Sequence, residues 1–232
     1  MENERKLILD TETTGLSFDT DKIIEIGIVE LKENVLTQNY FHEYINPEKD
    51  ISLSAQKVHG ISNEFLMDKP VFSKIAQKFL DFIRDDVLII HNAEFDINFI
   101  NKEFQNCGFN KINNTIIDTI KLAKKEFPGQ AVNLDSLCRK LNVNNTRQNY
   151  HGALLDATLL SKVYIKLTTG KQESLELTDN KFFKLNENEN INHYKNNFLI
   201  PRDKLMNLSD NEKREHENFI NKMKNPIWKK IK

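Results

Sequence analysis

The stretch LILDTETTGL, residues 7–16, decides the fold class. Three aliphatic residues run directly into Asp10 and Glu12, and the stretch then turns at Gly15. A continuous apolar run followed by threonines is typical of a buried strand. Because alternate residues of a strand face the same way, Asp10 and Glu12 project from one face. The sequence therefore predicts a core strand that ends in two neighbouring carboxylates.

The rest of the first 170 residues predicts hairpins followed by alternating strands and helices. Apolar spacing indicates further strands at 23–32, 35–45, 87–90 and 115–119, with a turn at Glu33-Asn34 between the first two. Helical patterns occur at 71–85, 119–126, 133–141 and 152–168, a short helix and turn at 52–62, and a helix after 90 that Asn92 is expected to cap. This order predicts an α/β fold with a mixed sheet flanked by helices.

Composition limits the classes of function. The chain has 232 residues, enough for one sizeable domain and an appendage. Its net charge of -1 excludes a generally basic nucleic-acid-binding protein, so any such contact must be local or assisted by metal ions. The two cysteines form no CxxC pair, and no apolar run reaches membrane-spanning length. We expect a cytoplasmic protein without disulfides or structural zinc.

The character of the sequence changes after Gly170. Residues 180–197 contain seven Asn and neither Gly nor Pro, which predicts a flexible linker. From Ser209 onward a helical pattern returns, with a capping box formed by Ser209 and Glu212. The expected organisation is a folded domain over 1–170, a linker over 171–208 and a C-terminal segment with a helix over 209–232.

Four acids and one histidine are candidates for chemistry. Asp10 and Glu12 would repel each other unless a cation lies between them, and hard carboxylate oxygens favour Mg²⁺ or Mn²⁺. Asp96 and Asp156 each accompany an apolar helical face, although an exposed acid near a helix start is the ordinary alternative for Asp96. His151 is five residues before Asp156, about 140° away on a helix, so it fits better on the loop entering that helix.

Three motifs with their order and spacing resemble the DEDDh exonucleases of the ribonuclease H-like fold. They are DTETTGL, HNAEFDINF and HGALLDA, with KIIEIGIVEL and VHGIS between the first two, and the similarity covers about residues 6–170. It is closest to the proofreading exonucleases of bacterial replicative DNA polymerases. The resemblance implies a five-stranded mixed sheet and a 3′-to-5′ exonuclease that removes mispaired 3′-terminal nucleotides with two metal ions.

The resemblance also implies roles for named residues. Asp10 would bridge two Mg²⁺ or Mn²⁺ ions, Glu12 and Asp156 would hold the ion of the attacking water, Asp96 would support the second ion, and His151 would be the general base. The substrate-contacting positions are Asp10, Glu12, Thr13, Leu16, Ser54, His59, Phe95 and Asp156. Close relatives often carry a glutamate where this chain has Ser54. For Leu16 and Phe95 the alternative is core packing, and His59 could be a turn residue.

Two partners are implied for the tail. QESLEL, residues 172–177, is similar to a peptide that binds the sliding clamp through Gln172, Leu175 and Leu177. The C-terminal segment resembles the one that holds the α subunit of the polymerase, with Phe219, Ile220, Met223 and Trp228 as anchors. The alternative for this segment is a helix that folds back on its own domain.

Two other functions stay open. The first is an RNA 3′-exonuclease similar to RNase T or oligoribonuclease, because the three motifs recognise a scissile phosphate that DNA and RNA share. The second is an inactive scaffold that only binds a polymerase, which the loss of any of the five site residues would favour. All five are present in this sequence.

Overall fold

The computed structural model describes residues 5–145 and 150–169, together with Arg214. The chain divides into two units, Met1–Ser174 and Leu175–Lys232, and every element below belongs to the first. Within its described residues the strands are β1 (Arg5–Thr13), β2 (Ile23–Lys32), β3 (Val35–Tyr44), β4 (Val87–Ile90) and β5 (Ile116–Asp118). The helices are α1 (Leu53–His59), α2 (Asn63–Leu66), α3 (Phe72–Ile83), α4 (Ala93–Asn106), α5 (Thr119–Glu126), α6 (Leu134–Lys140) and α7 (Ala153–Thr169).

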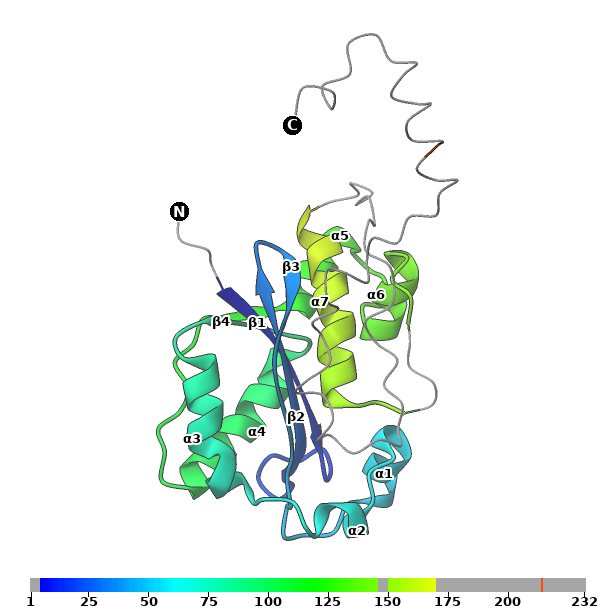
Figure 1. The fold of residues 1–232 in the computed structure, drawn as a ribbon. Helices are drawn as coiled ribbons and strands as arrows, with labels where there is room; N and C mark the ends of the chain where they lie inside the picture. The colour runs from blue at the N-terminus through cyan, green and yellow to red at the C-terminus, as the bar shows by residue number, and fades with distance from the viewer. Residues whose placement is uncertain (1–4, 146–149, 170–213, 215–232) are drawn as a thin grey trace. The chain divides into compact units, whose positions relative to one another are not determined.

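The described strands form one mixed sheet in the order β3-β2-β1-β4-β5 (Figure 1). β1, β2 and β3 pair antiparallel, whereas β4 pairs parallel with β1 and β5 pairs parallel with β4. The β2–β3 hairpin turns at Glu33 and Asn34, whose φ angles of 52° and 61° suit a tight two-residue turn. The predicted α/β fold, with its opening hairpins and mixed sheet, is confirmed.

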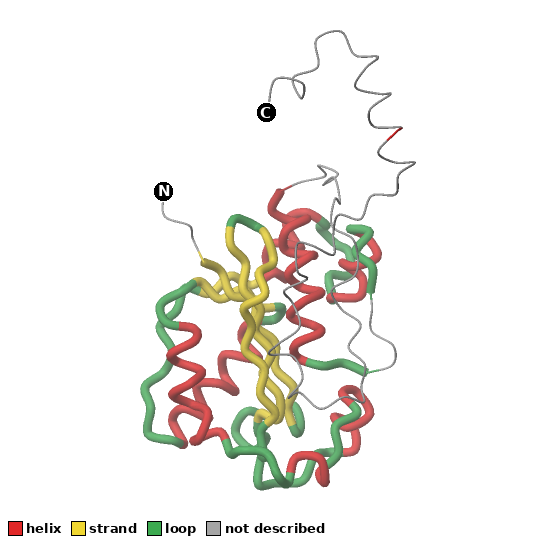
Figure 2. Tube along the Cα trace, in the orientation of Figure 1, coloured by secondary structure: helices red, strands yellow, loops and turns green. Residues whose placement is uncertain are grey.

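Helices cover both faces of the sheet, with α3 and α4 on one side and α5 to α7 on the other (Figures 1 and 2). Leu7 and Leu9 of β1 pack with residues of α3 and α4, whereas Ile8 packs with residues of α5, α6 and α7. Side chains of a strand alternate between its faces. The even-numbered residues of β1, including both of its acids, therefore face α7, and the odd-numbered residues face α4.

Two local details go beyond or differ from the sequence prediction. The expected short helix is α1, which ends at Gly60 in the left-handed region (φ 72°), but α2 directly after it was not expected. Asn92 occupies the N-cap position of α4, yet its backbone is left-handed (φ 69°) and its side chain makes no capping hydrogen bond. Side-chain capping needs an extended backbone, so the prediction that Asn92 caps through its side chain is wrong.

The predicted linker over 171–208 and the predicted helical segment over 209–232 lie outside the described residues, apart from Arg214. None of the helices in the described part of the chain combines the length and the apolar character needed to cross a membrane.

Candidate active site

The acidic end of β1 lies against the start of α7. Asp10 is paired in register with Gly27 of β2. A Cβ on Gly27 would lie 2.2 Å from the backbone nitrogen of Leu154, so this close approach of helix and sheet requires glycine. The contact brings Asp156, in the first turn of α7, to the acids of β1.

Glu12, His151 and Asp156 form the centre of the site. One carboxylate oxygen of each acid and one imidazole nitrogen all lie within 4.8 Å of one another. Glu12 is 9% exposed and Asp156 is 4% exposed, and Nδ1 of His151 lies 3.0 Å from Oδ2 of Asp156. His151 belongs to the loop before α7, as predicted. The loop allows a contact that two positions of one helix could not make.

Asp10 lies in the field of the other acids. Burial raises the pKa of Asp10 well above its ordinary value, and the charges of Asp96, Asp156, Glu12 and Glu25 raise it further. Part of the surface of Asp10 still reaches solvent. Such a cluster is stable only when it holds protons or a cation.

Asp96 approaches from α4, on the other face of the sheet. It is 4% exposed, which contradicts the alternative of an exposed acid at a helix start. Burial raises the pKa of Asp96 to about 7, although hydrogen bonds from Thr11 oppose the rise. Oγ1 of Thr11 donates to Oδ1 of Asp96 at 2.7 Å. This hydrogen bond fixes Oδ1 of Asp96 at the end of β1.

This set of side chains fits a divalent cation. Carboxylate oxygens are the hard ligands that Mg²⁺ and Mn²⁺ prefer, and an imidazole nitrogen is compatible with Mn²⁺. A cation among the acids would also relieve the repulsion that raises the pKa of Asp10. The structure thus places all five residues predicted for metal binding and catalysis at one end of the sheet.

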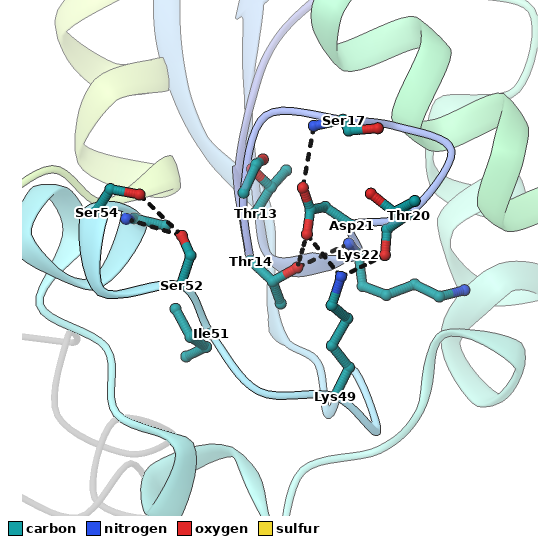
Figure 3. Close-up of polar contacts among 12 residues, drawn as sticks. Thr13, Thr14, Ser17, Thr20, Asp21, Lys22, Lys49, Ile51, Ser52 and Ser54 are labelled. Carbon is teal, nitrogen blue, oxygen red and sulfur yellow. Dashed lines mark hydrogen bonds and ion pairs between the residues drawn. The ribbon is translucent and has the colours of Figure 1, made fainter.

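The loop after β1 is held by Asp21 (Figure 3). The carboxylate of Asp21 accepts hydrogen bonds from Oγ1 of Thr14 at 3.2 Å and from the backbone nitrogen of Ser17 at 3.1 Å. It also pairs with Lys49, whose Nζ lies 2.7 Å from Oδ1. A Cβ on Gly15 would lie 2.4 Å from Oδ2 of Asp21, so a larger residue there would displace the Asp21 side chain.

The predicted substrate residues near this loop differ in their surroundings. Leu16 is 87% exposed, so core packing does not explain it. Oγ1 of Thr13 donates to the carbonyl of Gly15 at 2.6 Å and supports the loop. The ring of Phe95 is tilted against that of Phe99, with ring centroids 4.8 Å apart, and packs against the core under α3 and α4. For Phe95 the structure supports the packing alternative.

Ser54 and His59 lie at the two ends of α1. Ser54 is exposed, and its Oγ lies 3.1 Å from Oγ of Ser52, whose side chain caps the helix (Figure 3). His59 is buried, and its Nδ1 accepts from the backbone nitrogen of Ile61 at 3.0 Å. Burial lowers the pKa of His59, although the charge of Glu25 opposes this. The Nδ1 contact fixes the ring of His59 at the turn after α1.

A further acid beside the site, Glu25, was not predicted from the sequence. It is 2% exposed and is paired in register with Glu12. Nε2 of His42 lies 2.7 Å from its Oε1, and burial together with Glu25 raises the pKa of Tyr44. The feature of the sequence that could have pointed to Glu25 is its place as a charged residue inside the apolar run IIEIGIV. The register that sets it opposite Glu12 is not visible in either strand alone.

The clamp and polymerase predictions concern other parts of the chain. The residues predicted for them lie outside the described residues: Gln172, Leu175, Leu177, Phe219, Ile220, Met223 and Trp228.

Comparisons of sequence and fold define the class of the protein. A protein-family model described as Exonuclease matches residues 7–164. The solved nuclease domain of 3′hExo, described as a DEDDh family member bound to rAMP, is similar with a TM-score of 0.64. Its identity is 18%, over 72% of this chain and 93% of that chain, so it supports the fold alone. Fold and family model together define an exonuclease of the ribonuclease H-like class.

Curated relatives identify the branch of that class. DNA polymerase III subunit epsilon of Rickettsia typhi is 44% identical over 230 residues, which cover 96% of this chain and 98% of the relative. The protein of the same name from Buchnera aphidicola subsp. Acyrthosiphon pisum is 42% identical over 97% of each chain. The chain therefore belongs to the exonuclease family and, within it, to the DNA polymerase III subunit epsilon proteins. This confirms the family predicted from the three motifs, and the family implies divalent metal ions.

Proposed function

We propose that this chain is a 3′-to-5′ exonuclease that removes mispaired 3′-terminal nucleotides from DNA as the proofreading subunit of a replicative polymerase. The observation that carries the proposal is the convergence of Glu12, His151 and Asp156, with Asp10 and Asp96 close enough to share one electrostatic field. The names of relatives that match nearly the whole chain support DNA as the substrate. All five site residues lie together, which weighs against an inactive scaffold.

The acids would hold two ions, Mg²⁺ or Mn²⁺. When bound, such ions neutralise the scissile phosphate and stabilise the attacking and leaving oxygens of an in-line displacement. Asp10 would contact both ions, because the charges of Asp96, Glu12 and Asp156 all act on its carboxylate. Glu12 and Asp156 would hold one ion together with Asp10, and Asp96 would support the other.

His151 is the proposed general base. Its Nδ1 lies 3.0 Å from Oδ2 of Asp156, which fixes the ring and leaves Nε2 to accept a proton from the attacking water. The side chain is 41% exposed, so water reaches it. An imidazole held in this way contributes typically about 10²- to 10⁴-fold to a rate.

The substrate would be the frayed 3′ end of a strand. The exposed Leu16 sits on a loop that Asp21 holds in place, which suits a side chain that wedges against a terminal base. Thr13, Ser54 and His59 would border the same nucleotide, whereas Phe95 packs against the core. The net charge of -1 is consistent with a phosphate held mainly by metal ions.

One assay with four substrates tests this function. The chain is incubated with single-stranded DNA, a duplex with a 3′ mismatch, a fully paired duplex and single-stranded RNA, each labelled at the 5′ end. With Mg²⁺ or Mn²⁺ we expect stepwise shortening from the 3′ end, fastest for single-stranded and mismatched DNA, and none in EDTA. Preferred cleavage of RNA would favour the RNase T-like alternative. No cleavage of any substrate would contradict the exonuclease proposal.

We also propose that the tail binds two partners. The similarity to the Rickettsia typhi relative covers 96% of the chain and thus extends beyond residues 1–170. Deletion of 186–232 should keep exonuclease activity but abolish co-purification with the polymerase α subunit, and Phe219→Ala with Trp228→Ala should weaken that complex. Gln172→Ala with Leu175→Ala should weaken binding to the sliding clamp. Equal binding by the truncated chain would place the α contact on the exonuclease domain.

A further inference from the structure

Thr11 lies between the two acids of β1 and is not among the residues predicted to bind metal or substrate. Its side chain faces the α4 layer, because the neighbouring odd-numbered residues of β1 pack there. Thr11 is 7% exposed, and its Oγ1 donates to Oδ1 of Asp96 at 2.7 Å. Thr11 of β1 thus fixes the position of Asp96, which belongs to α4.

The contact lies where β1 extends beyond its neighbour. The last β1–β4 pair joins Leu9 and Ile90, so Thr11 is two residues past the end of that ladder. Burial raises the pKa of Asp96 to about 7, and hydrogen bonds from both the side chain and the backbone of Thr11 oppose the rise. Within the described residues, Asp96 thus bonds to β1 just past the end of the β1–β4 ladder.

We infer that Thr11 is the positioning residue of Asp96, and that its hydroxyl fixes Oδ1 so that Oδ2 is presented to a divalent cation at the end of β1. An ionised carboxylate offers about four acceptor sites, so one hydrogen bond leaves the other oxygen free to ligate. Thr11 itself touches no reacting atom. The inference rests on the proposed function, which supplies the cation.

A pair of substitutions separates the hydroxyl from the shape of the side chain. Thr11→Val keeps the shape and removes the hydroxyl, whereas Thr11→Ser keeps the hydroxyl. Mn²⁺ alone is titrated into the metal-free full-length chain by calorimetry. Because partners that orient metal ligands contribute about 10- to 100-fold in affinity, we expect Thr11→Val to weaken binding about tenfold or more and Thr11→Ser by no more than about threefold.

Thr168→Val is the matched control. Its hydroxyl donates to the carbonyl of Tyr164 at 2.9 Å, in the last turn of α7. Thr168 is 12 residues beyond Asp156, which corresponds to about 18 Å along a helix. This variant loses a hydroxyl by the same substitution and should bind Mn²⁺ as the unmodified chain does.

A double-mutant cycle makes the test specific to Asp96. In an Asp96→Asn background, Thr11→Val should have little further effect, because the hydroxyl acts through that carboxylate. Equal losses in both backgrounds, or unchanged Mn²⁺ affinity in Thr11→Val, would overturn the inference. Circular dichroism verifies folding, and Thr11→Ala replaces Thr11→Val if valine prevents it. A chain that binds Mn²⁺ but hydrolyses no DNA would contradict the proposed function while the Thr11 comparison still stands.

Discussion

The two ends of β1 differ in what surrounds their acids: a cation at one end and other acids at the opposite end. At its first residue, Arg5 pairs with Glu30 of β2 and with Asp86, and Glu30 also accepts hydrogen bonds from Thr37 and Asn39 at 2.9 Å each. Burial would raise the pKa of Glu30, but these partners lower it to about 2. At the other end, burial and neighbouring acids raise the pKa of Asp10.

The partners of a buried acid distinguish acids that stabilise the fold from acids that serve function. Glu30 is 3% exposed and Asp96 is 4% exposed, so burial alone does not distinguish them. The partners do, because Glu30 has a guanidinium beside it whereas Asp10 has four other carboxylates around it. A cluster of like charges costs stability in the folded chain, and an added cation can offset that cost.

The largest expected effect is the loss of hydrolysis in Asp10→Ala. Metal-assisted charge stabilisation is worth several kcal/mol, so the rate should fall by about 10³-fold or more. Asp156→Ala should behave similarly. In EDTA the variants should melt at or above the temperature of the unmodified chain, because one repelling carboxylate is gone. Single-turnover hydrolysis with circular dichroism measures both, and near-normal rates would contradict the metal assignment.

A smaller effect is expected for His151→Ala. The rate should fall by about 10²-fold or more, as for loss of a general base. Calorimetry with Mn²⁺ checks the role independently. A base leaves Mn²⁺ affinity nearly unchanged, whereas a loss of tenfold or more in affinity would show that His151 is a metal ligand instead.

Glu30→Gln tests the opposite end of the strand. The substitution removes one of the two carboxylates that pair with Arg5 and leaves Asp86, and weakening this partly buried pair should cost about 2 kcal/mol in the free energy of unfolding. Hydrolysis per folded molecule should stay the same, because Glu30 lies away from the acids of the site. Urea unfolding and single-turnover rates are the measurements. A large drop in rate with normal stability would undo the comparison.

A still smaller effect is expected on the pH dependence of the free energy of unfolding, measured in EDTA. The folded pKa of Asp96 is raised from 3.8 to about 7, so its contribution is present below about pH 4 and is lost as pH rises to about 7. The slope per proton is at most about 1.4 kcal/mol per pH unit. Asp96→Asn should reduce this slope, and the part due to Asp10, whose pKa is also raised, should remain. A slope that is unchanged in Asp96→Asn would show that this acid is not the source.

Glu30 should produce the opposite slope at lower pH. Its folded pKa is lowered from 4.5 to about 2, so its contribution is present above about pH 4.5 and is lost as pH falls toward 2. Glu30→Gln should remove the acid slope and leave the Asp96 slope intact. Identical profiles in the two variants would mean that the two ends of β1 do not differ as proposed.

Much of the fold was predictable because local patterns carried it. Alternating and continuous apolar runs marked the strands, and DTETTGL and HGALLDA placed the acids at a strand end and a helix start. The contacts of Thr11 and Glu25 were not predictable, since they depend on register between β1 and β2 and on the side from which α4 approaches. The left-handed Asn92 was missed because asparagine is also an ordinary capping residue.

The most direct test of the central claim is anomalous diffraction from crystals soaked in Mn²⁺. The account predicts two peaks, about 3.5–4 Å apart, contacted by Asp10 and shared among Glu12, Asp156 and Asp96. It predicts no peak at Glu30, because Arg5 already neutralises that acid. Manganese bound elsewhere, with none at the end of β1 under saturating Mn²⁺, would contradict the claim that these acids hold the catalytic ions.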